Sequence, residues 1–262
     1  MKRITHFCAL AACAAALVSA GVTANPLRWA ASGDPQTMDP HSQNEGLTNS
    51  VNSQVYEFLI QRDKKLQRVP GLATSWKQID ALTWQFTLRK GVKFHDGAPF
   101  TADDVVFSME RVKHANSQLR VYGNQVGVAR KIDDHTVEFK LPQVNPIFLD
   151  HIAALNIMNK AWSEKNNCTT PLDYKNKEEK FTSLNANGTG PFRLVSRQPD
   201  IKTIWKKNDA WWGKHEGNIT SVTYSSIKND ATRVAALISG ELDFVETQEI
   251  LLLLHHTHQE GK

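Results

Sequence analysis

The residues that could do chemistry are a histidine cluster late in the sequence and a glycine-rich loop. Imidazoles bind zinc, copper or nickel, and His255, His256 and His258 lie close together. No carboxylate or thiol at a fixed spacing completes a site there, so we expect no metal and no cofactor. The loop at 187–194 (NGTGPFRL) could cradle a phosphate, but Pro191 does not suit the start of a phosphate-binding helix.

Motifs of hydrolytic enzymes are missing from the sequence. It contains no Gly-x-Ser-x-Gly elbow and no His-Glu-x-x-His motif, and no pair of carboxylates stands out as a glycosidase pair. We therefore expect no enzymatic activity, with a secreted hydrolase kept as the alternative. A near-balance of 31 basic and 27 acidic residues argues against a nucleic-acid partner. Cys168 is the only cysteine after residue 24, which excludes an internal disulfide there.

The first 24 residues have the pattern of a secretory signal peptide. Lys2 and Arg3 precede an apolar segment at 10–22, and Val-Thr-Ala at 22–24 fits the cleavage rule. An alternative is a lipobox, Leu-Ala-Ala-Cys, which would make Cys13 a lipid anchor. Both alternatives predict export from the cytoplasm.

The elements that would position any site are clearest in residues 84–108, WQFTLRKGVKFHDGAPFTADDVVFS. Apolar and polar residues alternate over 84–88 and again over 92–94 around Lys90-Gly91, which predicts a β-hairpin. Thr101, followed three residues later by Asp104, predicts the capped start of a helix.

Other strands and helices are expected along the rest of the chain. Strands are predicted at 27–31, 131–141 and 241–245, and helices near 51–59, near 147–155 and from Asp230 to a stop at Gly240. The lysine-rich segment 159–180 lacks periodicity and predicts an exposed excursion. The mixture predicts an α/β fold.

Residues 84–108 closely resemble the signature of the family-five extracellular solute-binding proteins of bacterial ABC importers, of the oligopeptide- and dipeptide-binding type. Four further segments resemble landmarks of that family: 70–76, a short helix in relatives; 187–194; 208–213, with Trp211 at a tyrosine position; and 230–243.

The resemblance implies the clam-shell fold of periplasmic binding proteins (type II), in which two lobes close on a ligand. It implies a discontinuous first lobe, 25–68 and 184–245, with 69–183 inserted as a subdomain. The resemblance stops after residue 245, whereas relatives continue for roughly as long again. We therefore expect that the second lobe is missing and that 246–262 is an aberrant tail left by a C-terminal truncation.

The resemblance also implies a function. We expect a monomeric periplasmic protein that captures dipeptides or oligopeptides and delivers them to ABC permease subunits in the inner membrane, with that role impaired by truncation. An inert fragment is a further alternative, and glutathione, nickel chelates, haem or sugars remain possible cargoes. The expected ligand contacts are Glu45, Gly46, Leu47, Gly188, Thr189, Gly190 and Trp211.

Overall fold

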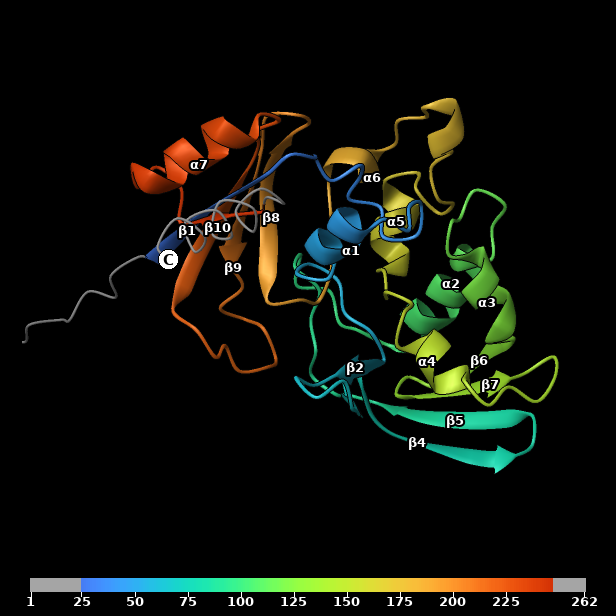
Figure 1. The fold of residues 1–262 in the computed structure, drawn as a ribbon. Helices are drawn as coiled ribbons and strands as arrows, with labels where there is room; N and C mark the ends of the chain where they lie inside the picture. The colour runs from blue at the N-terminus through green and yellow to red at the C-terminus, as the bar shows by residue number, and fades with distance from the viewer. Residues whose placement is uncertain (1–24, 247–262) are drawn as a thin grey trace, which may run out of the picture.

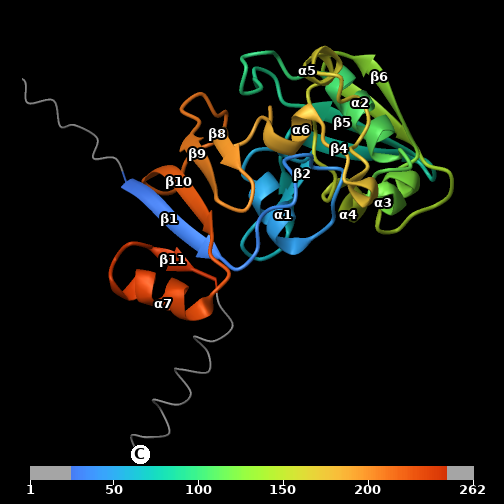
Figure 2. The ribbon, with the colours of Figure 1, turned by 90° about the horizontal axis from the view of Figure 1, so that it is seen from above.

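The computed structural model describes residues 25–246, which form two sheet-containing units side by side (Figure 1 and Figure 2). The predicted signal peptide with Cys13 and the histidines at 255, 256 and 258 lie outside the described residues. No helix within 25–246 has the length and apolar character needed to cross a membrane.

The first unit is a five-stranded sheet in the order β11-β1-β10-β9-β8. The opening strand β1 runs parallel to both of its neighbours, β10 and β11, while β9 runs antiparallel to both of its neighbours, β10 and β8. Helix α7 packs near Ala30 on one face of this sheet. The bounds are β1 Asn25–Ala31, β8 Phe192–Gln198, β9 Lys202–Lys207, β10 Ile219–Ser226, α7 Asp230–Ile238 and β11 Phe244–Val245.

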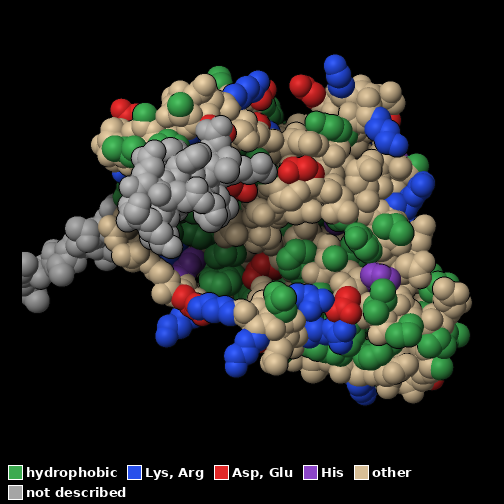
Figure 3. All heavy atoms as spheres, in the orientation of Figure 1, with side chains coloured by type: hydrophobic (Ala, Val, Ile, Leu, Met, Phe, Trp, Pro, Cys, Tyr) green, Lys and Arg blue, Asp and Glu red, His purple; other side chains and the backbone are tan. Residues whose placement is uncertain are grey.

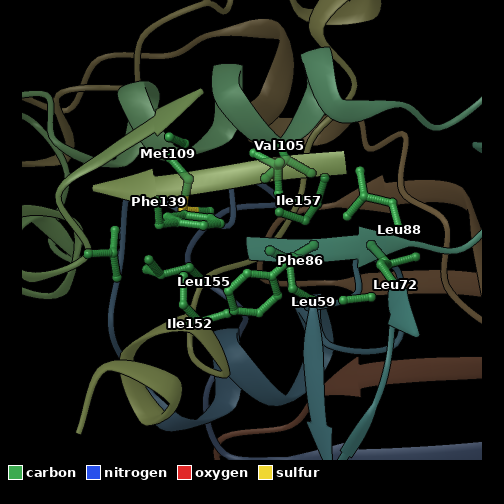
Figure 4. Packing of buried hydrophobic residues seen from close by; sticks show 14 of the residues in the cluster. Leu59, Leu72, Phe86, Leu88, Val105, Met109, Phe139, Ile152, Leu155 and Ile157 are labelled. Carbon is green, nitrogen blue, oxygen red and sulfur yellow. The ribbon is translucent and has the colours of Figure 1, made fainter. Parts of the chain in front are cut away.

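The second unit contains an antiparallel four-stranded sheet in the order β4-β5-β7-β6. Its core joins Phe86 of β5 and Phe139 of β7, 5.2 Å apart between ring centroids, to Met109 of α2 (Figure 4). The bounds are β4 Ala73–Asp80, β5 Thr83–Leu88, α2 Ala102–Val112, α3 Arg120–Gln125, β6 Val128–Asp133, β7 Thr136–Lys140 and α4 Phe148–Ile152.

Short elements connect the two units. A second buried cluster packs Val51, Val55 and Tyr56 against Trp205 and Tyr224 of the five-stranded sheet. The division of the chain into 25–68 with 184–245 and an inserted 69–183 stays a prediction. The remaining elements are α1 Gly46–Asn52, β2 Ile60–Arg62, β3 Arg68–Pro70, α5 Lys160–Lys165, a 3-10 helix Tyr174–Asn176 and α6 Phe181–Leu184.

Several predicted elements are confirmed. The opening strand is β1, and the segment 131–141 contains the end of β6, the turn after it and strand β7. At the start of α2 the Thr101 N–H donates to the Asp104 carboxylate at 2.9 Å, as a capping box requires. Helix α7 stops before Gly240, whose φ of +78° suits glycine. Its N-cap, however, is Asn229, whose side chain accepts from the Thr232 N–H.

The hairpin predicted over 84–94 is wrong. Strand β5 ends at Leu88 and pairs with β4 and β7. Val92 and Phe94 are buried side chains of a loop, so their spacing reflects burial without a strand. Residues 70–76 contain the start of β4 where a short helix was expected, because this segment pairs with β5.

The helix predicted over 51–59 is also wrong beyond Asn52. The carbonyls of Gln54 and Val55 accept the N–H groups of Phe192 and Gly190, at 3.0 and 2.9 Å. These carbonyls are therefore used by a segment distant in sequence and do not continue a helical ladder.

Three further expectations need correction. The segment 159–180 is an exposed excursion only in part: residues 174–179 are exposed, whereas Cys168 is fully buried and Leu172 nearly so. Helix α4 covers only 148–152 of the predicted 147–155, and β11 only 244–245 of the predicted 241–245.

Candidate functional site

A polar hollow of about 860 Å³ opens where β1 ends and α1 begins. We call it the polar hollow. The hollow is lined by Ser32 and Gly33, which follow β1, and by Glu45–Leu47 at the start of α1. Lys228, which precedes α7, and Asp230 and Arg233 of its first turn line the other side. The predicted contacts Glu45, Gly46 and Leu47 are thus brought together at one concave site.

Glu45 holds the start of α1 in place. Its carboxylate accepts the N–H groups of Leu47 and Thr48 at 2.8 and 2.9 Å and the Thr48 hydroxyl at 2.8 Å. Partial burial acts to raise the pKa of Glu45, but these hydrogen bonds outweigh it and the pKa is lowered. The carboxylate therefore stays ionised and orients the loop. The neighbouring Gly46 leaves the rim of the hollow open, because no atom lies within 4 Å of the position that a Cβ on Gly46 would take.

The polar hollow offers one exposed cation and one exposed anion. Arg233 is buried, donates to the carbonyls of Ile227 and Lys228 and pairs with Asp230, so its charge is already compensated. Lys228 and Glu246 are exposed and form no ion pair with another residue of 25–246. A ligand carrying both an ammonium and a carboxylate would complement this pair.

An apolar hollow of about 300 Å³ adjoins the polar one. It lies against the sheet and is lined by Leu27 and Trp29 of β1, Trp205 of β9, Val222 of β10 and Phe244 of β11. Trp29 and Ser50 line both hollows. Hydrophobic side chains also gather in the hollowed middle of the face shown in Figure 3.

The predicted contacts Gly188, Thr189 and Gly190 are buried and line neither hollow. A Cβ on Gly188 would lie 1.9 Å from the Val55 carbonyl oxygen, so glycine permits this close crossing. His95, which lies in residues 84–108, holds the 187–194 loop in place. Its backbone N–H donates to the Gly188 carbonyl oxygen at 2.8 Å, and its ring Nε2 lies 3.0 Å from the Gly190 carbonyl oxygen. The structure gives these glycines a packing role, and ligand contact by them stays a prediction.

Trp211 lies at a third hollow, of about 420 Å³, away from Glu45–Leu47. Its Nε1 donates to Glu57 at 3.2 Å, and Trp212 Nε1 donates to the other carboxylate oxygen at 2.7 Å. Glu57 is only 2% exposed, and burial raises its pKa against the effect of these bonds. Ligand stacking on Trp211 stays a prediction.

Residues of these hollows that sequence reasoning missed include Trp29, Ser50, Glu57, Lys228 and Glu246. Only Glu57 carried a local signal, as an acid inside the apolar run VYEFLI. Within the described part of the chain, no group of three or more His, Cys, Asp or Glu side chains is placed to hold a metal ion.

Comparison with known proteins identifies relatives. A family model described as bacterial extracellular solute-binding proteins, family 5 Middle, matches residues 67–253. This match includes eight residues beyond 245, where the sequence suggested that the resemblance stops. A dipeptide-binding protein of Escherichia coli K12 is 32% identical over 251 residues, covering 86% of this chain and 45% of the relative.

Solved structures agree with the family match. The periplasmic binding protein DppA of Helicobacter pylori, in complex with the peptide STSA, is 29% identical with a TM-score of 0.69, over 84% of this chain and 46% of that one. A dipeptide-binding protein of Pseudoalteromonas sp. SM9913, in complex with Met-Leu, is 26% identical with a TM-score of 0.74, over 88% and 49%. The fold of periplasmic binding proteins is therefore confirmed, and the chain spans less than half the length of these relatives.

Proposed function

We infer, because this chain belongs to the family-five bacterial extracellular solute-binding proteins, that it is the solute-capturing component of an ABC importer and that its solute is a short peptide. The relatives named for dipeptides and the solved complexes with STSA and Met-Leu support this cargo. Export to the periplasm and delivery to permease subunits of the inner membrane belong to the same proposal.

The observation that carries the proposal is the polar hollow with its two exposed charges, Lys228 and Glu246, which form no ion pair with another described residue. Its volume of about 860 Å³ lies within the range of small-molecule sites, roughly 300–1,000 Å³. A short peptide is zwitterionic, so its carboxylate can pair with Lys228 and its ammonium with Glu246. The exposed Gly46 rim leaves room for the peptide backbone. No observation favours a hydrolase.

Calorimetric titration of residues 25–262 with Gly-Gly tests the proposal. We expect binding that weakens when the peptide is N-acetylated or C-amidated, because each change removes one charge. Lys228→Met should weaken binding of Gly-Gly, whereas Lys202→Met, an exposed lysine on β9 outside the hollow, should not. A folded protein that binds no peptide would contradict the proposal.

A further inference from the structure

We propose that the third hollow, which Glu57 and Trp211 line, binds a small organic cation with an alkylated ammonium group. The hollow lies where residues 53–62, after α1, meet Pro191 and Trp211. Its volume of about 420 Å³ falls within the range of small-molecule sites, roughly 300–1,000 Å³. The inference goes beyond peptide capture, because no described residue that lines this hollow also lines the polar or the apolar hollow.

The first argument is a buried charge without a counter-charge. Glu57 is buried, and its carboxylate forms no ion pair with a lysine, arginine or histidine of residues 25–246. Its hydrogen-bond partners are neutral: the indole N–H groups of Trp211 and Trp212 and the side-chain amide of Gln61, which donates at 3.2 Å. Buried charges in proteins are normally paired. A cation in the hollow would supply the charge that this carboxylate lacks.

The indoles beside Glu57 provide the second attraction. The guanidinium carbon of Arg89 lies 4.0 Å from the centre of the Trp212 ring, so one of the two indoles already contacts a cation. Trp211, which is half-buried and lines the hollow, has no such cation over its ring within the described part of the chain. Tryptophan attracts cations more strongly than the other aromatic residues, and most strongly where water is excluded.

The lining favours an alkylated ammonium over a metal ion or a primary amine. Calcium and magnesium need about six oxygen ligands or more, and no group of metal-binding side chains is present in residues 25–246. Three donors already occupy the Glu57 carboxylate, which leaves little capacity to accept further N–H groups. An alkylated ammonium needs no hydrogen bond, and Phe58, Ala153 and Pro191 can contact its alkyl groups.

Arg62 is the only cation among the described residues that line this hollow. It is exposed, pairs with Asp150 at 2.5 Å and donates to the Leu66 carbonyl at 2.9 Å. Arg68 pairs with the same carboxylate at 2.6 Å, so Asp150 keeps a partner when Arg62 is removed. Because its positive charge opposes a bound cation, removing Arg62 should strengthen binding.

Calorimetric titration of residues 25–262 with tetramethylammonium chloride tests the proposal, with tert-butanol as an uncharged probe of similar shape. We expect the cation to bind at least about tenfold more tightly than the alcohol. Glu57→Gln should weaken binding of the cation at least about tenfold, whereas Arg62→Met should strengthen it by about threefold. The matched controls Glu164→Gln and Arg130→Met remove exposed charges outside the hollow and should leave the affinity unchanged.

Each outcome decides the proposal. Equal affinities of the wild type and Glu57→Gln would overturn it, because the cation would then bind elsewhere, as beside Glu246 of the polar hollow. Absence of binding by the folded wild type would also overturn it and leave peptide capture standing, since the titration with Gly-Gly is separate. If Glu57→Gln does not fold, Arg62→Met decides: tighter binding supports the proposal, and unchanged or weaker binding overturns it.

Discussion

Arg111 on α2 and Asp39 in the loop after β1 form an ion pair in which neither side chain is exposed to solvent. Nη1 of the arginine lies 2.9 Å from one carboxylate oxygen, and the guanidinium also donates to the carbonyls of Cys168 and Thr170. The Thr182 hydroxyl donates to the same carboxylate at 3.0 Å. Three segments far apart in sequence are therefore held at one buried charge pair.

Breaking this pair should destabilise the protein strongly. Arg111→Met leaves Asp39 buried without its counter-charge, and we expect a loss of about 3–5 kcal/mol in the free energy of unfolding, measured in urea. The matched control is Arg130→Met, which removes an arginine from an exposed pair with Glu138 at 3.0 Å and should cost less than about 1 kcal/mol. Similar losses of unfolding free energy in both variants would show that burial does not increase the contribution of the Arg111–Asp39 pair to stability.

Stability should fall on mild acidification because of two buried histidines. Burial lowers the pKa of His41 and of His95 to about 4. The unfolded chain takes up protons near pH 6.5, so stability is complete above that pH and falls by about 1.4 kcal/mol per unit for each histidine down to about pH 4. Urea unfolding between pH 7 and pH 4.5 measures this slope. His95→Gln should remove about half of it, and an unchanged slope would contradict this assignment.

Further acidification should lower the stability of the fold through protonation of Asp39. Burial acts to raise the pKa of this carboxyl, but Arg111 outweighs it and the pKa is lowered to about 2. Because the folded pKa lies below the unfolded value, this stabilisation is complete above about pH 4 and is lost as the pH falls toward 2. The Arg111→Met variant should show no such acid loss from Asp39, which acid unfolding monitored by circular dichroism would reveal.

The sequence predicted the elements whose patterns are local. The alternation around Phe86 identified β5, and the Thr101–Asp104 spacing identified the start of α2. It failed at the end of α1, where the carbonyls of Gln54 and Val55 are taken by residues near position 190. No local pattern contains that information.

The candidate site was predictable in part for the same reason. Glu45, Gly46 and Leu47 came from a motif resemblance and do line the polar hollow. Lys228 and Glu246 reach it only because β1 pairs in parallel with β10 and β11. Residues that are brought together by the pairing of distant strands have no characteristic spacing in the sequence, so a local motif cannot predict them.

Gly188→Ala should disrupt the crossing between the two units. The new Cβ would stand 1.9 Å from the Val55 carbonyl oxygen, a backbone atom that cannot rotate away, so we expect a loss of about 3 kcal/mol or more. Gly217→Ala is the control, since no atom lies within 4 Å of its Cβ position, and it should change stability by no more than about 1 kcal/mol. Equal unfolding midpoints for the two variants would contradict the packing role of Gly188.

Glu57→Gln should weaken the junction at which two indoles meet one carboxylate. The amide offers one oxygen where Trp211 and Trp212 each need an acceptor, so one indole N–H faces another donor. We expect a loss of about 1–3 kcal/mol at pH 7, measured by urea unfolding followed through tryptophan fluorescence. Glu164→Gln, in an exposed pair with Lys160, is the control and should lose less than about 1 kcal/mol.

The pH dependence of that loss distinguishes the buried carboxylate from a merely well-packed side chain. Burial raises the pKa of Glu57, so the folded state binds its proton at a higher pH than the unfolded chain does. The wild type therefore gains stability relative to Glu57→Gln as the pH falls through the folded pKa toward the unfolded value of about 4.3. The difference in the free energy of unfolding between the two proteins should therefore widen over that range. A constant difference would contradict the raised pKa, because it would show that Glu57 titrates as it does in the unfolded chain.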